Sequence, residues 1–111
     1  MNKQKLSNEE VVHQLMLAMQ KNDAKMIKSL FDTEASQAYG DGPFKKGKDF
    51  FKWLQSDIID RKGHVDHPIY NSEGTDHVIV KGQYSSEGYT NKADFLFEVK
   101  EGKIQSWQMR Y

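Results

Sequence analysis

The chain of 111 residues contains no cysteine, carries no net charge and has no long apolar run. Without cysteine it can hold no disulfide, no thiolate metal site and no cysteine nucleophile. Sixteen basic residues balance sixteen acidic ones, so the surplus of positive charge that serves nucleic-acid binding and electrostatic membrane attachment is missing. The first ten residues have no apolar core after their lysines, so we expect no signal peptide. The sequence predicts a cytoplasmic protein without nucleic-acid or membrane partners.

The length fits one domain, and we expect residues 1–111 to form it, with residues 1–7 flexible. Three helical patterns lie in the first half of the chain. Ser7 and Glu10 form a capping box before the first, Asn22 or Asp23 caps a shorter second, and the third follows Gly47.

Beyond Gly63 the apolar residues recur with a period of two, which predicts strands joined by hairpins. Together with one earlier strand, the element order is α-α-β-α-β-β-β-β, and the fold class is α+β with a curved antiparallel sheet against three helices. The predicted strands cover residues 35–40, 64–70, 77–84, 92–100 and 103–111.

The last two predicted strands indicate how the sheet is covered. Trp107, Met109 and Tyr111 share one very apolar face of the final strand. The strand before it carries apolar residues on both faces, with Leu96 on one and Phe95 on the other. A short chain whose sheet is apolar on both faces is expected to cover the second face with another subunit, so we predict a homodimer.

Several strings in this order resemble one known superfamily. They are SLF at 29–31, YGDGP at 39–43, Gly47 opening the third helix, FLFEV at 95–99 and EGKI at 101–104. The chain is similar to the nuclear transport factor 2-like superfamily, and within it to the SnoaL-like and ketosteroid isomerase-like group. The resemblance implies a cone of curved sheet and helices, an apolar pocket at the wide end, and dimerisation through the outer sheet face. It also implies a range of activities, from cofactor-independent isomerases, cyclases and dehydratases to non-catalytic binders.

The resemblance can be carried over residue by residue. The isomerase-like pattern pairs a carboxylate base with an oxyanion hole made of a tyrosine and a protonated aspartic acid. Asp94 matches the acid, Leu15 stands where the tyrosine would be, and the base position falls on Ala38 or Tyr39. The nearest carboxylate to that position is Asp41. Only one of the three roles is retained, which argues against the isomerase reaction itself.

Asp94 is the sharpest candidate for chemistry. If its strand face meets the pocket, burial would raise its pKa and leave a neutral acid that donates to a ligand carbonyl. The competing interpretation is a strand-end aspartate satisfied by Lys92 or a turn amide. Asp41 is the second catalytic candidate, with turn formation as its alternative. The residues predicted to bind ligand are Leu15, Tyr39, Trp53, Tyr84, Leu96, Trp107 and Met109.

Other chemistry finds little support. His64 and Asp66 would face one side of a strand and His67 the other, with His77 on the next strand, so we predict no metal site. No nucleophilic triad, phosphate loop or dinucleotide fingerprint is present, and we predict no cofactor.

The sequence therefore predicts a small-molecule-binding protein whose apolar ligand bears a carbonyl or hydroxyl, with proton transfer or cyclisation as the chemistry if it is an enzyme. The alternative is a non-catalytic module for self-assembly or partner binding with a vestigial pocket. The first hypothesis requires an open cavity with Asp94 on its wall. The second requires a cavity filled by Trp107, Met109 and Phe51.

Overall fold

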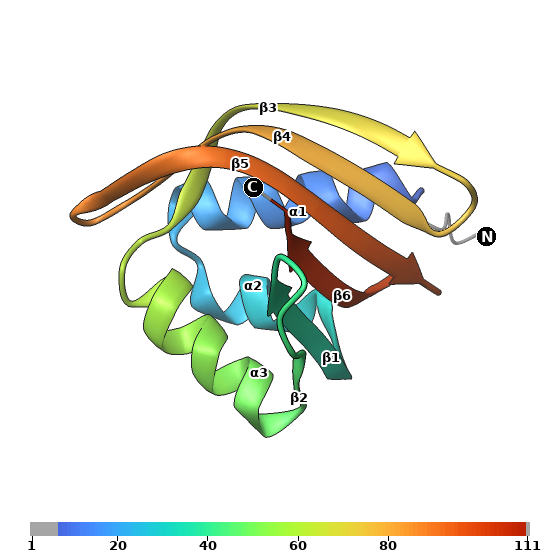
Figure 1. The fold of residues 1–111 in the computed structure, drawn as a ribbon, viewed down its shortest axis with the longest axis horizontal. Helices are drawn as coiled ribbons and strands as arrows, with labels where there is room; N and C mark the ends of the chain where they lie inside the picture. The colour runs from blue at the N-terminus through green and yellow to red at the C-terminus, as the bar shows by residue number, and fades with distance from the viewer. Residues whose placement is uncertain (1–6, 111) are drawn as a thin grey trace.

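The computed structural model describes residues 7–110, in which three helices pack against one face of a curved, unclosed sheet (Figure 1). The third helix continues into a π-helical segment, labelled η1. The elements are α1 (Asn8–Lys21), α2 (Ala24–Ser29), β1 (Phe31–Tyr39), β2 (Lys45–Lys46), α3 (Lys48–Trp53), η1 (Leu54–Ile59), β3 (His64–Glu73), β4 (His77–Ser86), β5 (Tyr89–Lys100) and β6 (Lys103–Met109).

The helix starts follow the capping signals. The Ser7 hydroxyl accepts from the Glu10 amide, and the Glu10 carboxylate accepts from the Ser7 amide, which confirms the capping box. Asp23 caps α2 by accepting from the Met26 amide. The predicted flexible segment lies outside the described residues except for Ser7, which this cap holds in place.

The sheet runs in the order β2-β1-β6-β5-β4-β3. Strands β3 to β6 form an antiparallel meander, as the hairpin signals predict. The expectation of a wholly antiparallel sheet is wrong at one place, because β1 pairs with β6 in parallel. After β1 the chain passes through α3 and strands β3 to β5 before β6 pairs with β1 in the same direction. No local turn signal encodes a pairing between strands joined by such a long crossover.

Three further boundaries differ from the sequence prediction. β1 begins at Phe31, four residues before the start of the strand predicted over residues 35–40. The two-residue strand β2 has no counterpart in the prediction. The expected loop over 85–91 is a tight hairpin, since β4 continues to Ser86 and β5 begins at Tyr89. Tyr111 lies outside the described residues.

The core lies between the sheet and the helices. α1 buries Val11, Val12, Leu15, Met16 and Met19 against it. From β5, Phe95, Phe97 and Val99 point to this side, whereas Asp94, Leu96 and Glu98 point to the outer face. Trp107 lies at the centre of an aromatic cluster with Phe31, Trp53, Phe95 and Phe97. In residues 7–110 no helix combines the length and the hydropathy that a membrane span requires.

Candidate functional site

A cavity of about 230 Å³ lies between η1 and the core-facing side of the sheet. Strands β1, β4, β5 and β6 contribute its other walls. Its lining mixes apolar side chains with hydroxyl, carboxylate and guanidinium groups: Tyr39, Asp57, Ile58, Arg61, Tyr84, Ser86, Tyr89, Phe95 and Met109. Ligand sites generally combine apolar walls with a few converging polar groups in this way.

The π-helical segment places Asp57, Ile58 and Arg61 at this cavity. The Asp60 amide donates to the Gln55 carbonyl and the Gly63 amide to the Ile58 carbonyl, each at 2.8 Å and each five residues back. This wider turn changes which side chains of the helix end face the sheet, and such segments recur at functional sites. Ile58 is buried, and Asp57 and Arg61 lie at the exposed rim.

Tyr39 is at the centre of the polar groups. The Trp53 indole N–H donates to the Tyr39 hydroxyl at 2.8 Å, so the hydroxyl proton of Tyr39 is left for another acceptor. Burial raises the Tyr39 pKa, the Trp53 hydrogen bond opposes this, and the Asp57 carboxylate adds to the increase. Tyrosine is protonated at neutral pH even at its ordinary pKa of 10.0, and the raised pKa extends this state to higher pH, so Tyr39 remains a hydrogen-bond donor.

The charges around Tyr39 have two signs. Asp57 accepts from the Ser56 hydroxyl at 2.8 Å, which leaves its other carboxylate oxygen for a further proton or donor. Lys45 lies 5.1 Å above the Tyr39 ring, and Arg61 lines the cavity beside Asp57. The site can thus present an acceptor, a neutral donor and positive charge to one small molecule.

The β4–β5 hairpin is fastened to the end of η1. The Glu87 amide donates to the Arg61 carbonyl at 2.9 Å, and Lys62 and Glu87 form an exposed ion pair at 3.7 Å. Gly63 completes the contact, because any Cβ there would collide with the Tyr84 hydroxyl. These contacts hold Tyr84 and Tyr89 over one side of the cavity.

Four predicted ligand-binding residues come together here. Tyr39, Tyr84 and Met109 line the cavity, and Trp53 borders it through its bond to Tyr39. Leu15 and Trp107 instead lie fully buried in the core and do not line it. The cavity is open even though Trp107 fills the core beneath it.

The placements expected for Asp94, Leu96 and Asp41 are wrong. Asp94 and Leu96 lie on the outer face of β5, where Asp94 pairs with Arg110 at 3.0 Å. Trp107 and Leu15 therefore do not surround Asp94. The face with four apolar residues, Ala93 to Val99 at alternate positions, is the one buried by the helices. Asp41 lies exposed in the turn after β1, away from the cavity lining.

The sequence reasoning missed Asp57, Arg61, Ser86, Tyr89 and the cavity role of Phe95. Ile58 forms an apolar stripe at helical spacing with Phe51 and Leu54 in the helical pattern that follows Gly47. Asp57 directly precedes it and Arg61 follows three residues later, so charged neighbours of that stripe near the helix end were the available signal. No sequence signal pointed to Tyr89, because residues 85–91 were expected to form a loop.

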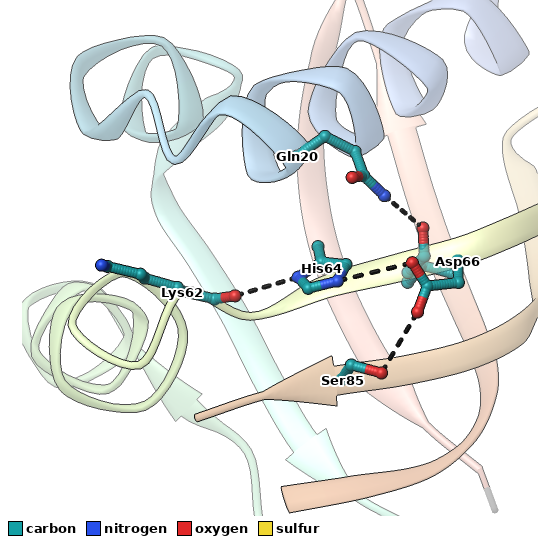
Figure 2. A network of polar contacts seen from close by, with 6 residues as sticks. Gln20, Lys62, His64, Asp66 and Ser85 are labelled. Atoms are coloured by element: carbon teal, nitrogen blue, oxygen red, sulfur yellow. Dashed lines mark hydrogen bonds and ion pairs between the residues drawn. The ribbon is translucent and has the colours of Figure 1, made fainter. Parts of the chain in front are cut away.

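A second polar cluster links β3, β4 and α1 (Figure 2). Asp66 stands between the His64 imidazole at 3.4 Å and the Ser85 hydroxyl, which donates to it at 3.2 Å. In a nucleophilic triad the histidine would lie between the serine and the carboxylate. Here the serine hydroxyl is directed to the carboxylate instead. Gln20 of α1 donates to the Val65 carbonyl at 2.8 Å beside this cluster, which ties the helix to β3.

The other histidines do not join this cluster in a metal site. Within residues 7–110, no group of three or more histidine, aspartate or glutamate side chains is arranged to hold a metal ion. The structural role of the cluster is to fix β3 against α1 and β4.

Comparison with known proteins defines the fold. No protein-family model matches the chain, and no curated protein matches its sequence. Among solved structures, it is similar to an NTF2-like protein of unknown function from Cytophaga hutchinsonii, with 17% identity and a TM-score of 0.81 over 96% of this chain and 91% of that one. It is also similar to a computationally designed 17-OHP binder, with 18% identity and a TM-score of 0.78 over 97% and 92% of the two chains.

A third similar structure is SalBIII, an epoxide hydrolase/cyclase-like enzyme in pyran ring formation in the polyether salinomycin. The identity is 16% and the TM-score 0.74, over 93% of this chain and 88% of that one. At these identities the likeness concerns the fold. The chain has the NTF2-like fold.

Proposed function

We propose that this protein binds a small, mainly apolar molecule bearing a carbonyl or hydroxyl group in the cavity between η1 and the sheet. The observation that carries the proposal is the convergence of Tyr39, Asp57 and Arg61 on a cavity whose other walls, apart from Ser86, are aromatic and aliphatic side chains. Its volume of about 230 Å³ exceeds the roughly 150 Å³ that accommodates benzene. A ligand of one or two rings fits this size.

The same groups support cofactor-independent proton transfer. Asp57 would accept a proton from the carbon next to a ligand carbonyl. The Tyr39 hydroxyl would donate a hydrogen bond to the enolate oxygen that develops. In a ketone with a β,γ double bond, return of the proton from Asp57 to the γ-carbon of the dienolate completes an isomerisation. In a ligand with a second carbonyl, the enolate carbon attacks that carbonyl carbon to close a ring, and Asp57 returns its proton to the alkoxide oxygen that forms. Similar structures that bind a ligand or act as cyclase-like enzymes support this reading.

Deuterium exchange tests the chemistry without knowledge of the natural substrate. β-Tetralone, a bicyclic ketone with acidic α-protons, is incubated with the protein in heavy water and its mass is followed. We expect exchange faster than with buffer or denatured protein, and Asp57→Asn should lower the enzymatic rate about 100-fold, as for loss of a general base. Tyr39→Phe should lower it about 10-fold or more, as for loss of an enolate donor.

Two matched carboxylates serve as controls. Asp94→Asn and Asp41→Asn remove the same charge outside the cavity lining and should leave the exchange rate unchanged. A slow Asp94→Asn variant with a normal Asp57→Asn variant would contradict the assignment. If β-tetralone binds but no variant changes its exchange, the protein is a binder without this chemistry.

For assembly we propose a homodimer through the outer sheet face. Ile69 is 69% exposed on β3, and its neighbours on that face include Ile79 of β4 and Leu96 of β5. Ile79 is already buried within the single chain, so a second copy covering this face would remove mainly apolar surface of Ile69 and Leu96 from water. Sedimentation of Ile69→Asp against the wild-type protein tests this, since a dimer through this face should dissociate and a dimer through another should not.

A further inference from the structure

Gln37 is a buried polar residue whose amide donors lack a good acceptor. Its side chain is fully buried on the core-facing side of β1. The Lys45 ammonium group, which can only donate, lies 2.9 Å from the amide oxygen of Gln37. The amide nitrogen must therefore face the other way, where it donates to the Met109 sulfur at 3.5 Å. A thioether is a weak acceptor, so this donor is poorly satisfied.

Trp107 places a second poorly satisfied donor in the same layer. Its indole N–H is buried and has no hydrogen-bond partner among the described residues. Gln37 and Trp107 are register partners in the parallel β1–β6 pair, and Tyr39 and Met109 are the next pair on the same face. The two residues that carry these donors thus lie one register pair below the pair that lines the cavity. Natural cores rarely leave such groups unpaired.

The Met109 side chain separates these donors from the cavity. It lines the cavity on one side and contacts Gln37 on the other. Methionine has an unbranched, adaptable side chain that changes rotamer at small cost. A change in Met109 would extend the cavity down to the Gln37 amide and bring the Gln37 donor to its floor.

We propose that Met109 covers a deeper subsite in which the Gln37 amide, assisted by the Trp107 indole, binds an acceptor oxygen of the ligand. The chemical class that fits is a ketone or similar carbonyl on an apolar ring, because both groups only donate and their surroundings are apolar. This inference rests on the proposed function. It adds a second polar anchor, distinct from Tyr39 and Asp57 at the rim.

The test compares β-tetralone with tetralin, the hydrocarbon of the same ring system, by nuclear magnetic resonance titration. In the wild-type protein we expect the ketone to shift the Trp107 indole signal and tetralin to leave it much less affected. Trp53→Phe identifies the signal by removing the other indole. Met109→Ala removes the cover and should tighten ketone binding by about three- to tenfold, the range of one neutral hydrogen bond.

Gln37→Met keeps the length of the side chain and removes its donor. It should abolish the preference for the ketone in the Met109→Ala background. Gln108→Met is the matched control, since Gln108 lies on the next strand but on the opposite face and donates to the Gly40 carbonyl. Should Gln37→Met fail to fold, the Trp107 indole signal in the wild-type protein still decides the question.

The two proposals can fail separately. Shifts at Tyr39 and Tyr89 without a shift at the Trp107 indole, or an undiminished ketone preference when Gln37→Met is added to Met109→Ala, would overturn the deeper subsite and leave the cavity function standing. If neither the wild-type protein nor Met109→Ala binds the ketone, both proposals are wrong.

Discussion

The two tryptophans provide a matched test of how the core is satisfied. Trp107 is fully buried and Trp53 is 6% exposed, so replacement by phenylalanine removes the same two carbons and one nitrogen from similar surroundings. The two indole N–H groups differ in their hydrogen bonding. That of Trp53 donates to Tyr39 at 2.8 Å, whereas that of Trp107 has no partner among the described residues. The two substitutions should therefore have different free-energy costs.

The magnitudes follow from the contacts. Lost burial and the cavity left behind cost about 2 kcal/mol in either variant. Trp53→Phe also loses a hydrogen bond worth about 1 kcal/mol, so it should destabilise the protein by about 3 kcal/mol. Trp107→Phe removes an unpaired buried donor, which returns about 1–3 kcal/mol, so its net effect should be near zero.

Urea unfolding followed by far-ultraviolet circular dichroism measures both free energies with one probe. The fluorescence of the remaining tryptophan provides a second probe for each variant and checks that unfolding is two-state. If Trp107→Phe costs as much as Trp53→Phe, the Trp107 indole N–H has a hydrogen-bond partner in solution and is not an unpaired donor.

Three further outcomes are expected. Gly63→Ala should destabilise the protein by about 1–3 kcal/mol in thermal unfolding, because its Cβ meets the Tyr84 hydroxyl, and adding Tyr84→Phe should recover part of the loss; equal stability of the single variant would contradict the close contact. Ser7→Ala should cost about 1 kcal/mol by removing the cap of α1, measured by the same method, and no loss would mean that α1 does not depend on it. Burial raises the pKa of Tyr70 from 10.0 to about 12, so the folded state holds the Tyr70 proton more tightly than the unfolded state. The free energy of unfolding should therefore fall as pH rises from 10.0 to about 12. Tyr70→Phe should lessen this fall, and a variant with the same pH profile as the wild-type protein would contradict the shift.

Local signals in the sequence predicted the elements well. The capping box at Ser7 and the cap at Asp23 act within one turn of chain, and so does the Glu101–Gly102 hairpin, where both residues adopt positive φ. Alternation along β5 also separated Asp94 and Leu96 correctly from Phe95. Such patterns are read from neighbouring residues, so they need no knowledge of the rest of the fold.

The errors concern features that distant residues decide. The alternation of apolar and polar residues does not show which face of a strand meets the helices. The match of Asp94 to the family's acid position selected the face of β5 that points away from them. Counting bulky apolar residues on each face of β5 would have favoured the face of Phe95 and Phe97. The parallel pairing of β1 with β6 joins segments about 70 residues apart, and loop closure over that length has no local signature. The π-helical turn that places Asp57 at the cavity likewise has no local sequence signal that would predict it.

The most direct test of the cavity as the binding site is an amide chemical-shift map of the wild-type protein titrated with β-tetralone. We predict that the shifts cluster at Tyr39, Asp57, Arg61, Tyr84 and Tyr89 and that they weaken in Tyr39→Phe. Shifts centred on the outer face around Asp94 and Leu96, or no saturable shifts at all, would contradict this prediction.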